Sequence, residues 1–172
     1  CPDFSLPEHF ILATLHRAEN TDSPERLQSI IAALEEIARE MPVVIPIHPR
    51  TRKKLQELNF NFKQTRLQLV DPVGYLEMVY LLKHCSLVAT DSGGLQKEAY
   101  FFKKYCITLR TETEWVELVE QGANIITGWR YEDILNSYKQ LKHTTKDVFS
   151  SPLYGDGQAG HIIIRELQRI DS

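Results

Sequence analysis

The sequence predicts an α/β fold, a three-layer Rossmann-like domain with a mainly parallel sheet. Short apolar runs rich in β-forming residues alternate with helix-like segments about six times, which is typical of a parallel sheet with helices on both faces. The chain has 172 residues, 42% of them hydrophobic. This length is enough for a single domain with a substantial core.

The first strand and helix are marked by clear local signals. Residues 10–15 form a continuous apolar run, as expected of a strand buried on both faces. After a polar, loop-like stretch, Asp22 or Ser23 followed by Pro24 and Glu25 indicates a helix start, and apolar residues recur after it at helical spacing. We expect this helix to end near Glu40, because Pro42 disfavours a helical residue before it.

Residues 43–47 form the second expected strand. Pro46 has no N–H group to donate, so we do not expect this strand to be fully paired in the centre of the sheet. A short basic helix at 51–58 and a third strand at 67–70 follow.

The rest of the chain continues the alternation. Gly122 is expected to end the helix that precedes the last strand. The remaining strands are expected at 87–90, 105–109 and 124–127, and the remaining helices at 75–82, 95–102, 115–120, 131–141 and 158–170.

Polar residues gather where five of these strands end. In a parallel sheet the carboxyl ends of the strands lie at one edge, and ligands bind there. Five polar clusters at such positions favour a binding domain over a purely structural one. The clusters are residues 16–20, 48–50, 71–75, 92–94 and 110–114.

The fourth cluster is Ser92-Gly93-Gly94, placed between a strand and a helix start. Unpaired N–H groups and a partial positive charge at a helix N-terminus suit an anion, and the two glycines let the backbone approach it closely. Glu98 lies about one turn further on, where its carboxylate could accept hydrogen bonds from sugar hydroxyls. The stretch could also be ordinary turn chemistry, but the other clusters favour a nucleotide or nucleotide-sugar diphosphate site.

The residues after the first two strands have several possible roles. His16 and Arg17 together supply donors suited to phosphate oxygens, although His16 could instead cap loop carbonyls. Glu19 and Asn20, which follow them, make a ligand role more plausible. For His48, ligand contact and plain loop chemistry are equally consistent with the sequence.

Near the fifth strand, Arg110 is expected to pair with a phosphate or a carboxylate. Glu114 is consistent with a first-turn carboxylate favoured by the helix dipole. We expect Trp115 to serve mainly in packing, with its ring also able to cover a base or sugar. Lys97 is expected at a solvated helix position.

Composition and charge exclude several classes of protein. A formal net charge of -3 gives no basic field for nucleic acid. No apolar run approaches the roughly 20 residues that span a bilayer. Cys1, Cys85 and Cys106 lack metal-type spacing, and Cys85 and Cys106 are expected to be core residues of a cytoplasmic protein. Because the first residue is Cys, we expect the chain to be part of a longer protein.

Five motifs in order resemble the C-terminal half of the non-hydrolysing UDP-N-acetylglucosamine 2-epimerases. Each motif is weak alone, but five in register are specific, and they span nearly the whole chain. They lie at 14–20, 48–49, 90–99, 109–114 and 154–159.

The resemblance implies one half of a GT-B-type enzyme, with two Rossmann-like domains and a UDP-sugar in the cleft between them. Such enzymes interconvert UDP-GlcNAc and UDP-ManNAc without NAD or metal. UDP is eliminated to leave a 2-acetamidoglucal, and it is added back after protonation on the opposite face. The N-terminal domain, absent here, carries the carboxylates that move the C2 proton. The resemblance therefore implies that this chain alone is inactive and that the full-length enzyme is a cytoplasmic homodimer.

The resemblance also implies roles for single residues. Residues 92–94 would hold the diphosphate, Glu98 the ribose hydroxyls and backbone near Met78 the uracil. His16 would assist the departure of UDP. Arg17 and Arg110 would make further contacts to UDP. Contacts to the substrate or to a second, regulatory UDP-sugar are implied for Glu19, Asn20, His48 and Glu114. Arg17 also matches a position that faces this second UDP-sugar.

Two positions depart from the family pattern. Lys97 stands where a second Glu is common, and Trp115 replaces an arginine expected near the diphosphate. The second change leaves open an epimerase for another UDP-HexNAc derivative. Two further alternatives are a GT-B glycosyltransferase module and a non-catalytic domain that senses UDP-sugars.

Overall fold

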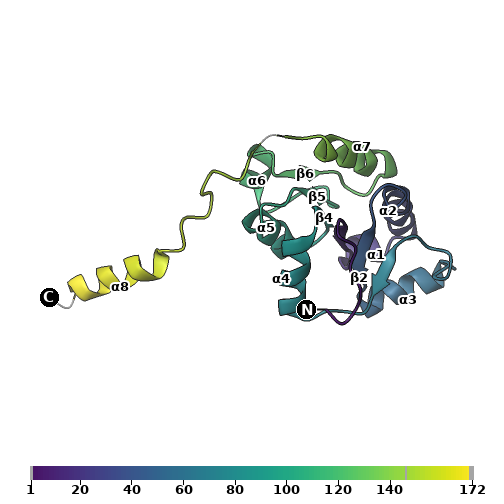
Figure 1. Ribbon diagram of the computed structural model, residues 1–172, viewed down its shortest axis with the longest axis horizontal. Coiled ribbons are helices and arrows are strands. Elements are labelled where there is room, and N and C mark those ends of the chain that lie inside the picture. The colour runs from purple at the N-terminus through teal and green to yellow at the C-terminus, as the bar shows by residue number, and fades with distance from the viewer. Residues whose placement is uncertain (1, 146, 171–172) are drawn as a thin grey trace.

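The computed structural model describes residues 2–145 and 147–170. Six strands form one sheet in the order β3-β2-β1-β4-β5-β6, and every neighbouring pair is parallel. The expected parallel α/β architecture is confirmed (Figure 1). The strands are β1 (Ile11–Thr14), β2 (Val43–Pro46), β3 (Gln68–Val70), β4 (Leu87–Thr90), β5 (Cys106–Thr108) and β6 (Asn124–Ile126).

Helices connect the strands and cover both faces of the sheet, and the last helix stands apart from them (Figure 1). The single turn at Ala18–Thr21 lies in a stretch predicted as loop. The helices Pro49–Glu57 and Gly93–Phe101 each begin two residues earlier than expected because His48 and Ser92 cap them, and the helix Pro24–Ile37 ends before the expected Glu40. The helices are α1 (Ala18–Thr21), α2 (Pro24–Ile37), α3 (Pro49–Glu57), α4 (Tyr75–His84), α5 (Gly93–Phe101), α6 (Val116–Glu120), α7 (Tyr131–Lys142) and α8 (Ala159–Ile170).

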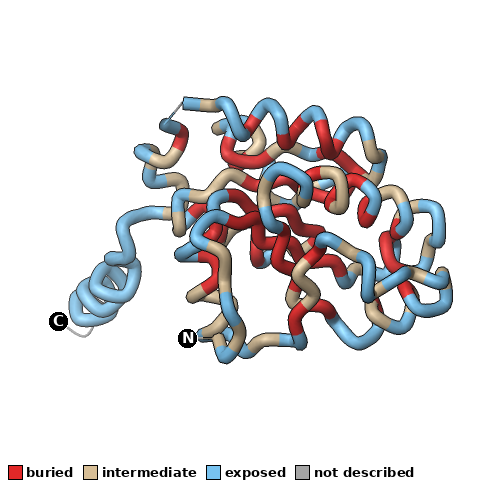
Figure 2. The backbone as a smooth tube through the Cα atoms, turned by 45° about the vertical axis from the view of Figure 1, so that its right-hand side comes forward, coloured by how far each residue is buried: buried red, intermediate tan, exposed pale blue. Residues whose placement is uncertain are grey.

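Side chains alternate between two cores, one on each face of the sheet. Ile11 and Ala13 of β1 point into a core shared with α2, α3 and α7. Phe10 and Leu12 point to the opposite face, into a core shared with α4 and α5. The buried segments therefore lie in the centre of the molecule, and the outer surfaces of the helices are exposed (Figure 2).

The expectation for Pro46 is wrong. β2 is an interior strand, hydrogen-bonded to β1 on one side and β3 on the other. Pro46 is tolerated because it is the last residue of the strand, and the next residue, Ile47, donates its N–H to Val70 O over 3.0 Å. The missing proline N–H thus lies where the ladder ends.

Cys85 and Cys106 are core residues, as expected. Their exposed fractions are 1% and 0%, and both are free thiols. Burial raises the thiol pKa of each to about 12. Both therefore remain protonated near neutral pH. Cys1 lies outside the described residues.

The helix α8 stands apart from the rest of the fold. It projects away from the sheet at the end of an extended segment (Figure 1). Its apolar side chains remain exposed; Ile162, Ile163, Ile164 and Leu167 have exposed fractions of 54–59%. Within residues 2–145 and 147–170, the structure has no helix with the length and apolar character needed to cross a membrane.

Candidate functional site

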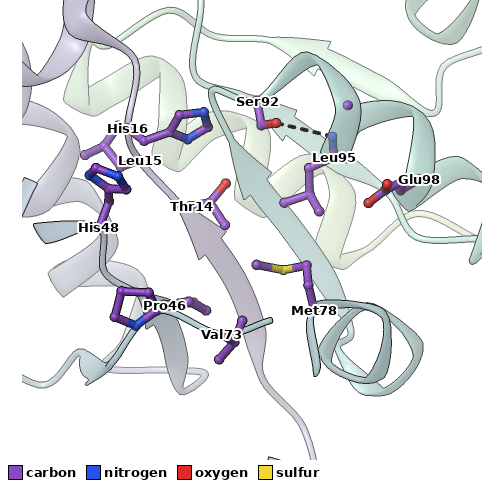
Figure 3. Close-up of a pocket in the computed structure, with 12 residues that line it drawn as sticks. Thr14, Leu15, His16, Pro46, His48, Val73, Met78, Ser92, Leu95 and Glu98 are labelled. Carbon is purple, nitrogen blue, oxygen red and sulfur yellow. Dashed lines mark hydrogen bonds between the residues drawn. The ribbon is translucent and has the colours of Figure 1, made fainter. Parts of the chain in front are cut away.

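A cavity of about 320 Å³ opens at the carboxyl ends of β1 to β4 (Figure 3). It lies beside the junction of β1 and β4, where the connections of the sheet reverse direction, which is the position expected for a ligand in this type of fold. The lining residues are Thr14, Leu15, His16, Pro46, His48, Pro72, Val73, Met78, Ser92, Gly94, Leu95 and Glu98.

The N-terminus of α5 forms one wall of the cavity. Ser92 Oγ accepts the N–H of Leu95 over 3.4 Å, and the N–H of Ser92 itself donates to Thr90 Oγ1 over 2.9 Å. Within the described residues no acceptor is found for the N–H groups of Gly93 and Gly94. A Cβ on Gly94 would meet only Ser92 Oγ, at 4.0 Å, so this end of the helix is open. It has the unpaired donors that bind an anion.

Three further predicted residues surround this wall. Met78 enters from α4, Glu98 from α5, and His48 from the start of α3 (Figure 3). His48 also caps α3, because its Nδ1 accepts the N–H of Arg50 over 3.2 Å. The part of the chain that the structure describes provides no hydrogen bond or ion pair to the Glu98 carboxylate, which is therefore available to a ligand.

Asp91 organises the opposite wall, a role that the sequence did not reveal. Its carboxylate has an exposed fraction of 0% and accepts the N–H groups of His16 at 3.1 Å and Arg17 at 2.9 Å. Asn20 Nδ2 donates to it over 3.3 Å and to Leu109 O over 2.9 Å. One buried carboxylate thus fixes the single turn of α1 against the end of β4. The amide of Asn20 is engaged within the protein, whereas Glu19 is exposed.

The same carboxylate orients the ring of His16. His16 Nδ1 lies 3.2 Å from Asp91 Oδ1, and 46% of the His16 side chain is exposed. Asp91 favours the proton on Nδ1, because a carboxylate accepts hydrogen bonds. The other nitrogen, Nε2, has no partner among the described residues and remains available to a ligand in the cavity.

Arg17 and Arg110 do not line the cavity. Both guanidinium groups pair with Glu114: Arg110 Nη1 lies 2.7 Å from Oε2, and Arg17 Nη2 lies 3.3 Å from Oε1. The hydrogen bond from Arg110 is the main reason that the pKa of Glu114 is lowered, and the charge of Arg17 adds to the effect. The sequence left phosphate and carboxylate open as partners of Arg110, and in this structure the partner is a carboxylate.

Trp115 supports the start of α5 from outside. Its Nε1–H donates to Gly93 O over 2.7 Å. Lys97 Nζ lies 4.6 Å from the centre of the Trp115 ring and 4.2 Å from that of Tyr154. The prediction that Lys97 is simply solvated is therefore incomplete, because its ammonium group lies over two aromatic rings.

A sequence model of the family described as UDP-N-acetylglucosamine 2-epimerase matches residues 3–168. The chain belongs to this family. The match covers the strands, the cavity and α5, so the resemblance expected from five short motifs is confirmed over the domain.

Relatives in this family have similar sequences and the same fold. A UDP-2,3-diacetamido-2,3-dideoxy-D-glucuronate 2-epimerase from Pseudomonas aeruginosa is 52% identical, over 94% of this chain and 45% of its own. A UDP-GlcNAc 2-epimerase structure from Methanocaldococcus jannaschii has a TM-score of 0.85 at 38% identity, covering 96% of this chain and 47% of its own. Another from the same organism, in complex with UDP-GlcNAc and UDP, has a TM-score of 0.80 at 39% identity, covering 94% and 46%.

The chain thus spans about half the length of the epimerase relatives that it matches. No cluster of three or more His, Cys, Asp or Glu side chains suited to a metal ion occurs within the described ranges. The cavity in this chain is lined by a helix N-terminus, by His16 and His48, and by Glu98, whose carboxylate has no partner among the described residues.

Proposed function

We propose that this chain is the UDP-binding half of a sugar-nucleotide 2-epimerase that interconverts UDP-GlcNAc and UDP-ManNAc. The observation that carries the proposal is the open N-terminus of α5 in the same cavity as the unpaired Glu98 carboxylate. These two features match the two parts of a nucleoside diphosphate: phosphates need N–H donors, and ribose hydroxyls need an acceptor. The relative bound to UDP-GlcNAc and UDP supports the same ligand class.

In this proposal the diphosphate lies at Ser92, Gly93 and Gly94, and Glu98 accepts the ribose hydroxyls. The uracil lies toward Met78, where α4 borders the cavity. Arg17 and Arg110 supply positive charge beside the diphosphate. These assignments fit an elongated ligand that enters along the edge of the sheet over β1 and β4.

His16 is the proposed catalytic residue. Elimination breaks the bond between C1 of the sugar and the UDP oxygen and removes the proton from C2. The electron pair of the C1–O bond leaves with UDP. The imidazolium form of His16, whose Nδ1–H faces Asp91, donates its Nε2–H to the phosphate oxygen on which the charge develops. Asp91 holds the ring in place through Nδ1. Re-addition of UDP after protonation on the opposite face gives the 2-epimer.

The proton transfer at C2 is assigned to residues outside this chain. Among the residues that line the cavity, the one carboxylate is that of Glu98, which in this proposal binds the ribose hydroxyls. The exposed apolar residues of α8 support a second domain as partner, because large apolar side chains gathered on an exposed helix mark an interaction surface. A homodimeric full-length enzyme in the cytoplasm belongs to the same proposal.

A second candidate substrate is a UDP-HexNAc derivative such as UDP-2,3-diacetamido-2,3-dideoxy-D-glucuronate. The 52% identity with the relative named for this compound favours it. Trp115, which stands where the family resemblance leads us to expect an arginine, is a second reason to compare the two sugars.

Calorimetric titration of the chain with UDP tests the proposed site. Ser92→Ala removes a hydroxyl from the phosphate site, and we expect it to weaken UDP binding about tenfold. Ser23→Ala is a matched control, because Ser23 caps α2 over the same 3.4 Å distance far from the cavity. Glu98→Gln should weaken UDP binding similarly, and Glu120→Gln should not. Unchanged UDP affinity in both Ser92→Ala and Glu98→Gln would contradict the proposed UDP site.

Incubation of the chain alone with UDP-GlcNAc tests whether the proton transfer at C2 needs residues outside this chain. We expect binding without turnover. Sustained formation of UDP-ManNAc would contradict the assignment of the C2 proton chemistry to another domain. The same assay on a longer protein that contains this chain, with both candidate UDP-sugars, identifies the preferred substrate from the ratio of the two kcat/KM values.

A further inference from the structure

Glu114 is the shared anionic partner of two arginines beside the anion site. Its Oε2 accepts from Arg110 Nη1 over 2.7 Å, and its Oε1 accepts from Arg17 Nη2 over 3.3 Å. The family resemblance implies contacts to UDP for both arginines. In this structure their positive charge is neutralised by a side chain of the protein itself.

The carboxylate also lies against the first residue of α5. A Cβ built on Gly93 would be only 3.2 Å from Glu114 Oε2, closer than an ordinary contact. Glu114 therefore occupies a position next to the positive end of the helix, where negative charge is favoured. A phosphate bound at Gly93 and Gly94 would have to share this space and the same two guanidinium groups.

The two arginines differ in how much freedom they have. Arg110 has an exposed fraction of 5%, and its buried Nε has no hydrogen-bond partner among the described residues. Most buried donors have an acceptor, so an oxygen brought next to this Nε–H would give it the hydrogen bond that it lacks. Arg17 has 37% of its side chain exposed, and its backbone N–H is fixed by Asp91. Its guanidinium group can therefore turn while its Cα stays in place.

We propose that Glu114 is an internal counter-anion that a phosphate group of the ligand displaces from Arg17 and Arg110. The inference rests on the proposed UDP site and adds a residue that sets its selectivity. Only an anion that offers more charge and more acceptor oxygens than one carboxylate gains by the exchange. A diphosphate meets this requirement, whereas a monocarboxylate metabolite does not.

The test compares Glu114→Gln with wild type in titrations with UDP and, separately, with inorganic pyrophosphate. Removal of the competing charge should tighten binding of both ligands about tenfold. The gain should shrink at high salt, because the freed arginines are partly exposed. Glu112→Gln is the matched control: it makes the same charge change in the same loop, at an exposed residue, and should leave both affinities unchanged.

Glu114→Asp provides a second variant if the buried Arg110 makes Glu114→Gln unstable. It keeps the charge but shortens the side chain, so that it cannot span both arginines, and we expect a smaller gain in UDP affinity. Unchanged or weaker binding of UDP and pyrophosphate in the folded variants would overturn the inference. If the Glu114 variants bind pyrophosphate more tightly but neither they nor wild type bind UDP, the role of Glu114 is supported and the proposed UDP-binding function is contradicted.

Discussion

Two carboxylates hold Arg17 from different sides, and they differ in burial. Asp91 accepts the backbone N–H of Arg17 and has an exposed fraction of 0%, whereas Glu114 accepts from its guanidinium group and is 51% exposed. Asp91 is bound mainly by backbone amides and a buried asparagine, which cannot leave. Glu114 is bound by side chains, which can rotate. The same functional group therefore fixes structure in one place and can be exchanged in the other.

The largest expected effect is on stability and comes from removing the buried carboxylate of Asp91. Asp91→Ala leaves the backbone amides of His16 and Arg17 without an acceptor, and Asn20 Nδ2 loses one of its two hydrogen bonds; all three groups are buried or half-buried. We expect a loss of about 3 kcal/mol in the free energy of unfolding. Chemical denaturation measures it.

Asp71→Ala is the control for that substitution. Asp71 pairs with Arg52 but has 94% of its side chain exposed, so the change should stay within about 0.5 kcal/mol of wild type. Equal losses in the two variants would show that the burial of Asp91 does not set its contribution.

A smaller effect is expected from Trp115, the neighbour of Glu114. Trp115→Phe keeps a ring beneath Lys97 but removes the Nε1–H that Gly93 O accepts at 2.7 Å. We expect a loss of about 1 kcal/mol in unfolding free energy and a several-fold weaker affinity for UDP, because the first turn of α5 is less firmly held. Trp129→Phe, on the opposite face, should lower stability without a change in UDP affinity. The idea fails if both variants bind UDP as wild type does.

The smallest expected effect is a pH dependence of stability that arises from the exposed carboxylate of Glu114. The pKa of Glu114 is lowered from its usual value of 4.5 by the hydrogen bond from Arg110. The ionised pair therefore stabilises the fold above that value, and the stabilisation is lost as the pH falls through the lowered folded pKa. The stability difference between wild type and Glu114→Gln should shrink as the pH falls through 4.5 and then through the lowered folded pKa, as followed by denaturation at each pH. A constant difference would contradict this linkage.

Most of the fold could be predicted because it depends on local patterns. The apolar run at 10–15 and the helix signals at 23–25 describe β1 and α2 whatever lies elsewhere in the chain. α1 could not be predicted in this way. It has four residues and no side-chain cap, and Asp91, distant in sequence, holds it in place.

The candidate site divides along the same line. Ser92 caps α5 and Glu98 lies within it, at a spacing that the sequence shows directly, and both line the cavity. The pairing of Arg110 with Glu114, and its extension to Arg17, depends on the side chain that fills the space beside Gly93. Sequence spacing could not decide between a phosphate and a carboxylate there. It also gave no indication that Asp91 supports His16. The ligand contacts themselves stay predictions.

The pairing of β1 with β4 has a consequence for how the molecule acquires its cavity. Thr14 and Thr90, whose hydroxyls meet at 2.6 Å, are 76 residues apart, and closing a loop of that length is slow compared with forming local helices. On the ribosome, β1, β2 and β3 emerge well before Asp91 does. A nascent chain that has not reached β4 has no partner for this edge of β1, so the cavity is completed in a late, long-range folding event.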